Sequence, residues 1–74
     1  MPDLEVDARG LLCPLPVLRL ARALRKASGG TVVLLLATDP ASAGDVEAFC
    51  QERGNSLLSA EREGTIFRFR VRKN

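Results

Sequence analysis

Chemistry in this sequence centres on Cys13, which stands in the stretch "GLLCPLP" directly before Pro14 and three residues before Pro16. The chain has two cysteines and no histidine. Cysteine hydrolases and acyl transferases usually activate the thiol with a histidine, so that route is excluded here. Two thiols also fall short of the four ligands of a structural zinc site, and we expect neither a metal nor a bound cofactor. The chemistry that remains is thiol exchange, in which Cys13 accepts a sulfur atom or another thiol and passes it on.

The two prolines predict that Cys13 lies at the start of a helix. Apolar residues recur at helical spacing from Pro14 to Ser28, and the Ser-Gly-Gly run at 28–30 predicts the end of that helix. Pro14 is expected at the first helical position and Pro16 at the third, where no intrahelical hydrogen bond is lost. Cys13 would then be the N-cap residue, beside the positive end of the helix dipole, which favours a thiolate. We therefore expect Cys13 to be exposed and its pKa to be lowered.

Neighbouring residues bear on how Cys13 behaves. Arg9, four residues upstream, is a candidate for stabilising the thiolate, and Gly10 is expected to adopt the special backbone angle of the loop. Two alternatives stay open, namely Cys13 as a small buried hydrophobic residue, and a disulfide or resolving pair between Cys13 and Cys50. Cys50 shares helical spacing with Val46 on an apolar stripe, so we expect Cys50 to be buried.

The first half of the chain predicts two strands joined by the helix. Alternating apolar and acidic residues predict a half-buried strand over 3–8. The run over 31–38 is apolar on both faces and rich in branched residues, which is typical of a central strand. Because a helix connects these strands, we expect them to be parallel.

The second half predicts a helix followed by a hairpin. The helix runs from about Ala41 to Arg53, with Gly54 as its stop, and the hairpin turns at 63–64. The order is β-α-β-α-β-β, an α/β class, and the 74 residues are expected to form a single domain over 1–74. A chain this short cannot supply a third layer, so both helices must cover the same face of the sheet.

The central strand is therefore expected to keep one face free of helices. That face carries one of two alternating sets, either Val32, Leu34 and Leu36 or Val33, Leu35 and Ala37. The last strand is expected to turn its apolar face to the core, with Phe67, Phe69 and Val71. Its other face lies on the open side and carries Ile66, Arg68, Arg70 and Arg72. The result is an apolar strip flanked by arginines, a candidate partner surface.

Composition favours a globular chain, since 46% of residues are hydrophobic and 27% are charged. The sequence has neither the features of a signal peptide nor the roughly 20 apolar residues that cross a bilayer, so we expect a cytoplasmic protein without membrane association. The net charge of +2 is small and the three phenylalanines fall on predicted core faces, so direct binding of nucleic acid is not expected. Basic residues are concentrated in the first helix and the last strand. They form either solvated faces or contacts with a partner.

The stretch "DARGLLCPLPVL" resembles the signature of the TusA/SirA-like sulfur-carrier family, a Cys-Pro-X-Pro motif that follows an Asp-X-X-Gly approach. The matching residues are Asp7, Gly10, Cys13, Pro14 and Pro16. The similarity continues through "ATDPASAGDVEAFC" and the closing "FRFRVRK", so that it covers essentially the whole chain.

This resemblance implies a two-layer α/β sandwich in which two helices cover one face of a mixed four-stranded sheet. It also implies a sulfur carrier rather than a self-sufficient enzyme. Cys13 would accept sulfane sulfur as a persulfide from a cysteine desulfurase or a rhodanese-like donor and relay it to an acceptor protein. Routes of the family include tRNA thiolation, sulfur oxidation and molybdenum-cofactor assembly.

One position departs from the family pattern. Leu15 stands where the carriers of tRNA thiolation have a glutamate, which suggests a different partner surface. We expect Leu15, Arg19 and Arg22 to contact the partner, because basic residues on the first helix attract acidic surfaces. The alternatives are a regulatory or redox partner protein and a nucleic-acid-binding module, both without persulfide transfer.

Overall fold

The computed structural model describes residues 2–74, which form two helices and four strands. In chain order the elements are β1 (Leu4–Ala8), α1 (Leu15–Lys26), β2 (Val32–Ala37), α2 (Ser42–Arg53), β3 (Ser56–Glu63) and β4 (Ile66–Arg72). No helix within residues 2–74 has the length and apolar character needed to cross a membrane.

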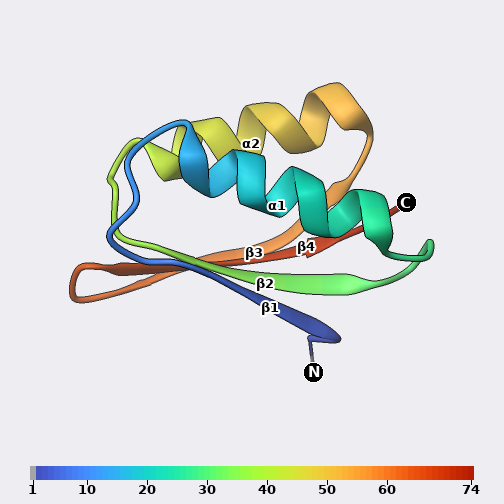
Figure 1. Cartoon of the computed structure of the whole chain (residues 1–74), viewed down its shortest axis with the longest axis horizontal. Coiled ribbons are helices and arrows are strands. Elements are labelled where there is room, and N and C mark those ends of the chain that lie inside the picture. Colours follow the sequence, from blue (N-terminus) through green and yellow to red (C-terminus); the bar gives the residue numbers. More distant parts are fainter. Residues whose placement is uncertain (1) are drawn as a thin grey trace.

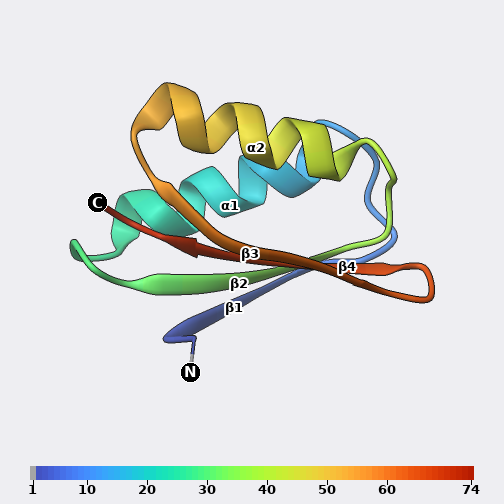
Figure 2. The ribbon, with the colours of Figure 1, turned by 180° about the vertical axis from the view of Figure 1, so that it is seen from behind.

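The four strands form one mixed sheet in the order β1-β2-β4-β3. β1 pairs with β2 in parallel, whereas β4 is antiparallel to both of its neighbours. Both helices lie on one face of the sheet, and the other face is open (Figure 1, Figure 2). The expected two-layer α/β sandwich and its β-α-β-α-β-β order are confirmed.

The core lies between the helices and the sheet. On β2, the alternating residues Val33, Leu35 and Ala37 are fully buried. Phe69 and Val71 of β4 stand beside Leu35 and Val33 in the register and are also buried, as expected. The set of β2 residues on the open face is therefore Val32, Leu34 and Leu36, and each of them is half-buried.

Each helix contributes a narrow buried stripe. α1 buries Leu20 and Leu24, one turn apart, and α2 buries Val46 and Cys50 at the same spacing. The helix α2 ends at Gly54, whose positive φ of 73° is the left-handed conformation that favours glycine.

The helix boundaries are slightly narrower than the sequence predicts. α1 was expected over 14–28 and runs over 15–26, while α2 was expected from about residue 41 and begins at Ser42. Pro14 is the N-cap of α1 and Pro16 is its second residue, so both prolines sit one position earlier in the helix than expected. Cys13 is consequently outside the helix, before its N-cap, and the expectation that it caps α1 is wrong.

Charges are distributed differently over the two layers. The ion pairs within residues 2–74 all involve residues of the sheet or the loop that follows β1, namely Arg9–Asp7, Arg68–Glu63 and Arg70–Glu61. The last two neutralise much of the basic stripe on the open face, because they join neighbouring strands. We call the exposed basic residues of the two helices the helical cations, and in the described structure none of them forms an ion pair; they are Arg19, Arg22, Arg25, Lys26 and Arg53.

Burial of α1 gives a first prediction. Replacement Leu20→Ala should lower the free energy of unfolding by about 3 kcal/mol, because it leaves a cavity in the core. Domains of this size have only about 5–10 kcal/mol of stability, so the loss is a large part of the total. Urea denaturation measures it.

The matched control is Leu18→Ala, the same change two positions away, where the side chain is 55% exposed. It should change stability by less than about 0.5 kcal/mol. Equal losses in the two variants would contradict the orientation of α1.

Candidate functional site

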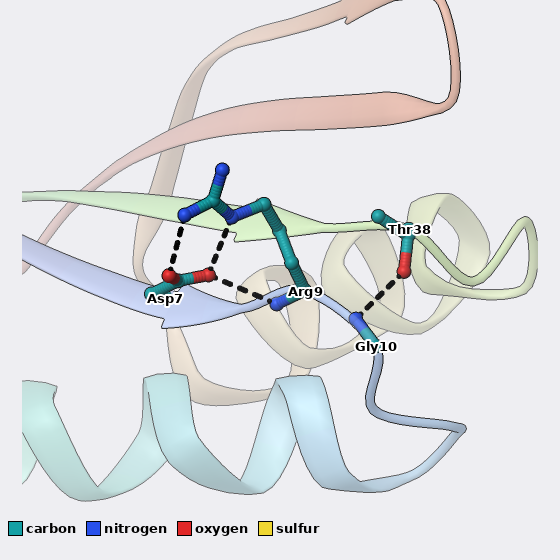
Figure 3. Close-up of polar contacts among 4 residues, drawn as sticks. All are labelled: Asp7, Arg9, Gly10 and Thr38. Atoms are coloured by element: carbon teal, nitrogen blue, oxygen red, sulfur yellow. Dashed lines mark hydrogen bonds and ion pairs between the residues drawn. The ribbon is translucent and has the colours of Figure 1, made fainter.

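The parallel pairing of β1 with β2 brings two loops together. Ala8 stands opposite Ala37 at the end of the paired register, so both strands leave the sheet at the same edge. The segments 9–14 and 38–41 that follow lie beside each other at one end of the molecule (Figure 1, Figure 2). The N–H of Gly10 donates a 2.9 Å hydrogen bond to the hydroxyl oxygen of Thr38, which ties one loop to the other (Figure 3).

Gly10 has the backbone angle that was expected of it. Its φ is +82°, in the region that side chains other than glycine rarely adopt. A Cβ at this position would meet nothing within 4 Å, so the requirement for glycine comes from the backbone angle and not from crowding. The loop can therefore turn away from β1 and still present its N–H to Thr38.

Arg9 is bound to Asp7 and not to the thiol. Its guanidinium donates two hydrogen bonds, of 2.9 and 2.8 Å, to the two carboxylate oxygens of Asp7 (Figure 3). The pairing lowers the pKa of Asp7 to about 2, mainly through the side-chain hydrogen bond from Arg9. Both side chains are half exposed. The expected role of Arg9 in stabilising the thiolate is not supported by this geometry.

Cys13 is exposed and faces two carboxylates. Its Sγ donates a hydrogen bond to Oδ2 of Asp45, in the first turn of α2. Its backbone N–H donates a 2.7 Å hydrogen bond to Oδ2 of Asp39. The other oxygen of Asp39 accepts the N–H of Ala41 at 3.1 Å, and these two bonds hold the pKa of Asp39 below its usual value. The thiol is thus held at the meeting point of the two loops and α2.

These carboxylates reverse the expected electrostatics of the thiol. The pKa of Cys13 is raised, first by the hydrogen bond to Asp45, then by desolvation, and then by the negative charges of Asp45 and Asp39. The expectation of a lowered pKa is wrong. The reason is that a carboxylate in hydrogen-bond contact favours the protonated thiol, whereas the helix end supplies only about half a charge to a residue outside the helix.

Asp39 and Asp45 are functional candidates that sequence reasoning did not assign to the site. Asp45 lies 32 residues from Cys13, and in the sequence it stands out only as part of the stretch "ATDPASAGDVEAFC" that continues the family resemblance. A signal was present in the predicted topology, because loops that follow adjacent parallel strands meet at one edge of a sheet. Acids in the loop after β2, or in the first turn of the next helix, could therefore have been placed near Cys13.

The other motif residues shape the surface around the thiol. Pro16 is buried, whereas Leu15 remains 46% exposed. Two more leucines close to Cys13 in sequence, Leu12 and Leu18, are 71% and 55% exposed. The two basic residues of α1 that are expected to contact the partner, Arg19 and Arg22, are also exposed. Three exposed leucines thus lie within five residues of Cys13 in the sequence, and we call Leu12, Leu15 and Leu18 the apolar collar.

Cys50 has a different environment. It is 3% exposed within the core, as expected, and burial raises its pKa. Both cysteines are free, so the structure contains no Cys13–Cys50 disulfide. Of the two thiols, Cys13 alone is accessible to another protein.

A family of known proteins matches nearly the whole chain. The profile of the family described as "Sulfurtransferase TusA" matches residues 4–73. The chain belongs to the TusA family. Within the family, it is 44% identical over 72 residues to the sulfur carrier protein TusA of Allochromatium vinosum, covering 97% of this chain and 95% of that protein.

Two other proteins extend the comparison. The chain is 45% identical over 62 residues to a putative sulfur carrier protein of Neisseria meningitidis serogroup A, covering 84% of each chain. Its fold matches the crystal structure of a SirA-like protein from Desulfitobacterium hafniense with a TM-score of 0.81. That match covers 93% of this chain and 95% of the other at 24% identity, so it supports the fold of this TusA-family chain.

The carboxylates at the site lead to a second prediction. Alkylation of Cys13 by iodoacetamide, followed by peptide mass spectrometry across pH, should give an apparent pKa above that of an ordinary thiol. Replacement Arg9→Gln should leave that pKa unchanged, because Arg9 is bound to Asp7.

The same measurement shows whether the pKa of Cys13 is set by Arg9 or by the carboxylates of Asp45 and Asp39. A pKa below the ordinary range, rising in Arg9→Gln, would show that the arginine acts on the sulfur. It would contradict the contacts of both residues.

Proposed function

We propose that this TusA-family protein carries sulfane sulfur as a persulfide on Cys13. The observation that carries the proposal is the accessibility of the two thiols, since Cys13 is exposed in the Cys-Pro-X-Pro loop and Cys50 is buried. The relative from Allochromatium vinosum is named a sulfur carrier, and the likeness extends over nearly the whole chain.

The surroundings of Cys13 suit a carrier better than an enzyme with its own substrate. The thiol of Cys13 lies on an exposed loop. A partner must therefore bring its own sulfur-bearing group to the loop. The apolar collar offers that partner a surface to bury, and the helical cations favour an approach by an acidic protein.

The proposed transfer needs no oxidant or reductant. Cys13 attacks the outer sulfur of a donor persulfide, the sulfur–sulfur bond of the donor breaks, and the donor leaves as a thiol. The balance is Cys13–SH + R–S–SH → Cys13–S–SH + R–SH, and the second transfer to the acceptor has the same form. The proposed persulfide transfer requires no cofactor besides the sulfur that Cys13 carries.

The donor in this proposal is a cysteine desulfurase or a rhodanese-like protein, and the receiver is a downstream sulfur-acceptor protein of the cytoplasm. The candidate routes are tRNA thiolation, sulfur oxidation and molybdenum-cofactor assembly. Leu15 favours a route other than tRNA thiolation, because the apolar collar replaces the negative charge found in those carriers.

The third prediction tests the carrier itself. Incubation with cysteine desulfurase and cysteine should add one sulfur atom, roughly 32 Da, to the wild type and to Cys50→Ala, and nothing to Cys13→Ser. Mass spectrometry of the intact protein measures the gain. A mixed disulfide without transferable sulfur would instead indicate a redox partner, and an equal gain in Cys13→Ser would remove Cys13 from the proposal.

The fourth prediction concerns the apolar collar. Replacement Leu15→Ala should weaken sulfur uptake from a protein donor about fivefold, through KM, because roughly 1 kcal/mol of apolar burial is lost from the interface. Alkylation of Cys13 should not change, since the thiol keeps its own contacts.

The matched control for the collar is Leu58→Ala on β3. Leu58 is 50% exposed, close to Leu15 in exposure but on a different element. Uptake should be unaffected by this replacement. Equal effects of the two variants would argue against docking at the collar.

A further inference from the structure

We propose that Asp45 is the proton acceptor of Cys13 during sulfur uptake, and that it returns the proton to the departing thiol. This role deepens the proposed function and rests on sulfur transfer at Cys13. It assigns catalytic work to a carboxylate in a chain that has no histidine.

The geometry meets the first requirement for a general base, which is contact with the atom that loses the proton. Oδ2 of Asp45 accepts the hydrogen bond of Cys13 Sγ. Asp45 is half-buried in the first turn of α2, so its position is set by a helix and not by a mobile loop. Its carboxylate is therefore held against the sulfur.

Two other charged groups of these loops, Asp39 and Arg9, already have partners. Asp39, in the loop before α2, accepts the N–H groups of Cys13 and Ala41. Arg9, on the same loop as Cys13, is bound to Asp7. In the described structure Asp45 forms no ion pair, so it keeps the ability to accept a proton.

The same contact explains how an idle carrier avoids side reactions. Two carboxylates without a cation keep the thiol protonated, and a thiol is far less reactive than a thiolate towards oxidants and alkylating agents. When a partner covers the loop, water is removed from Asp45. A carboxylate deprived of water holds a proton more readily, so docking favours transfer from sulfur to oxygen.

Proton and electron pairs balance in this step. As Sγ of Cys13 attacks the outer sulfur of the donor persulfide, the Sγ–H proton moves to Asp45. The S–S bond of the donor breaks, its electron pair stays on the inner sulfur, and that sulfur takes the proton from Asp45. The products are a persulfide on Cys13, a donor thiol and an ionised Asp45, ready for another cycle.

Asp45 could instead act only by suppressing the thiolate of Cys13. Alkylation and sulfur uptake together distinguish this role from proton acceptance. Alkylation by iodoacetamide needs only the thiolate, whereas uptake from a persulfide also needs a route for the proton. The variant Asp45→Asn keeps the size of the side chain and removes its charge. In this variant, alkylation near pH 7.5 should become about tenfold faster, because loss of the hydrogen-bonded carboxylate lowers the pKa of Cys13.

Uptake should change in the opposite direction. With a cysteine desulfurase and cysteine as the sulfur source, the 32 Da gain on Cys13 at the same pH should be at least about tenfold slower in Asp45→Asn than in the wild type. Its rate should then rise with pH, as the thiolate forms without help. Asp45→Glu, which restores a carboxylate, should recover part of the uptake rate.

The matched control is Glu47→Gln, an equal loss of charge at an exposed position of the same helix. Both rates should stay near those of the wild type. Circular dichroism and thermal melting establish that each variant is folded before rates are compared.

Several results would overturn the proton role. If alkylation and uptake both become faster in Asp45→Asn, the carboxylate only suppresses the thiolate. If neither rate changes, Asp45 does not act on the sulfur. If the wild type gains no sulfur at all, the carrier function itself fails, which is a different result from normal loading of Asp45→Asn.

Discussion

The parallel pairing of β1 with β2 is the interaction on which the site depends. Parallel neighbours end at the same edge of a sheet, and here that edge releases the loop with Cys13 and the loop with Asp39 side by side. The helix that connects the two strands is needed for parallel pairing, and its first turn follows directly after Cys13. The second helix begins where the other loop ends, which places Asp45 against the thiol. One pairing thus positions the sulfur, both acids and the start of both helices.

The local contacts show a thiol that is held back and not activated in the free protein. A helix start was expected to favour the thiolate, yet Asp45 and Asp39 together favour the protonated form. A protonated thiol suits a carrier protein whose cysteine is exposed to solvent between partners. Reactivity in such a carrier is best released at the partner, where water is excluded and electrostatic interactions are stronger. In the proposed transfer, the contact between Cys13 and Asp45 has two roles: it keeps the thiol protonated in the free protein, and it lets Asp45 accept the proton of the thiol when a donor is bound.

Most of the fold could be predicted from apolar periodicity, because each layer needs one buried stripe per helix and one buried face per strand. The helix start was placed one residue early because prolines at 14 and 16 fit the first turn of the helix in either register. The choice between the two faces of β2 could not be made from its own residues, since both faces are apolar; the helices decide it by burying Val33 and Leu35. The topology could place Asp45 near Cys13, but their contact could not be predicted. It depends on the side-chain directions of a loop residue and of a residue in the first turn of α2, and no local pattern encodes them.

The helical cations of α1 lie at a defined distance from the loop that carries Cys13. α1 has 12 residues, so the basic residues near its end lie about 18 Å from the loop that carries the thiol. A partner that engages both ends of α1 needs an acidic surface at that distance from the sulfur it exchanges. A small persulfide can meet the thiol but not the far end of the helix. In the proposed docking, the basic residues along α1 therefore add contacts that a protein donor can make and a free small-molecule persulfide cannot, and these contacts weaken as salt screens the charges.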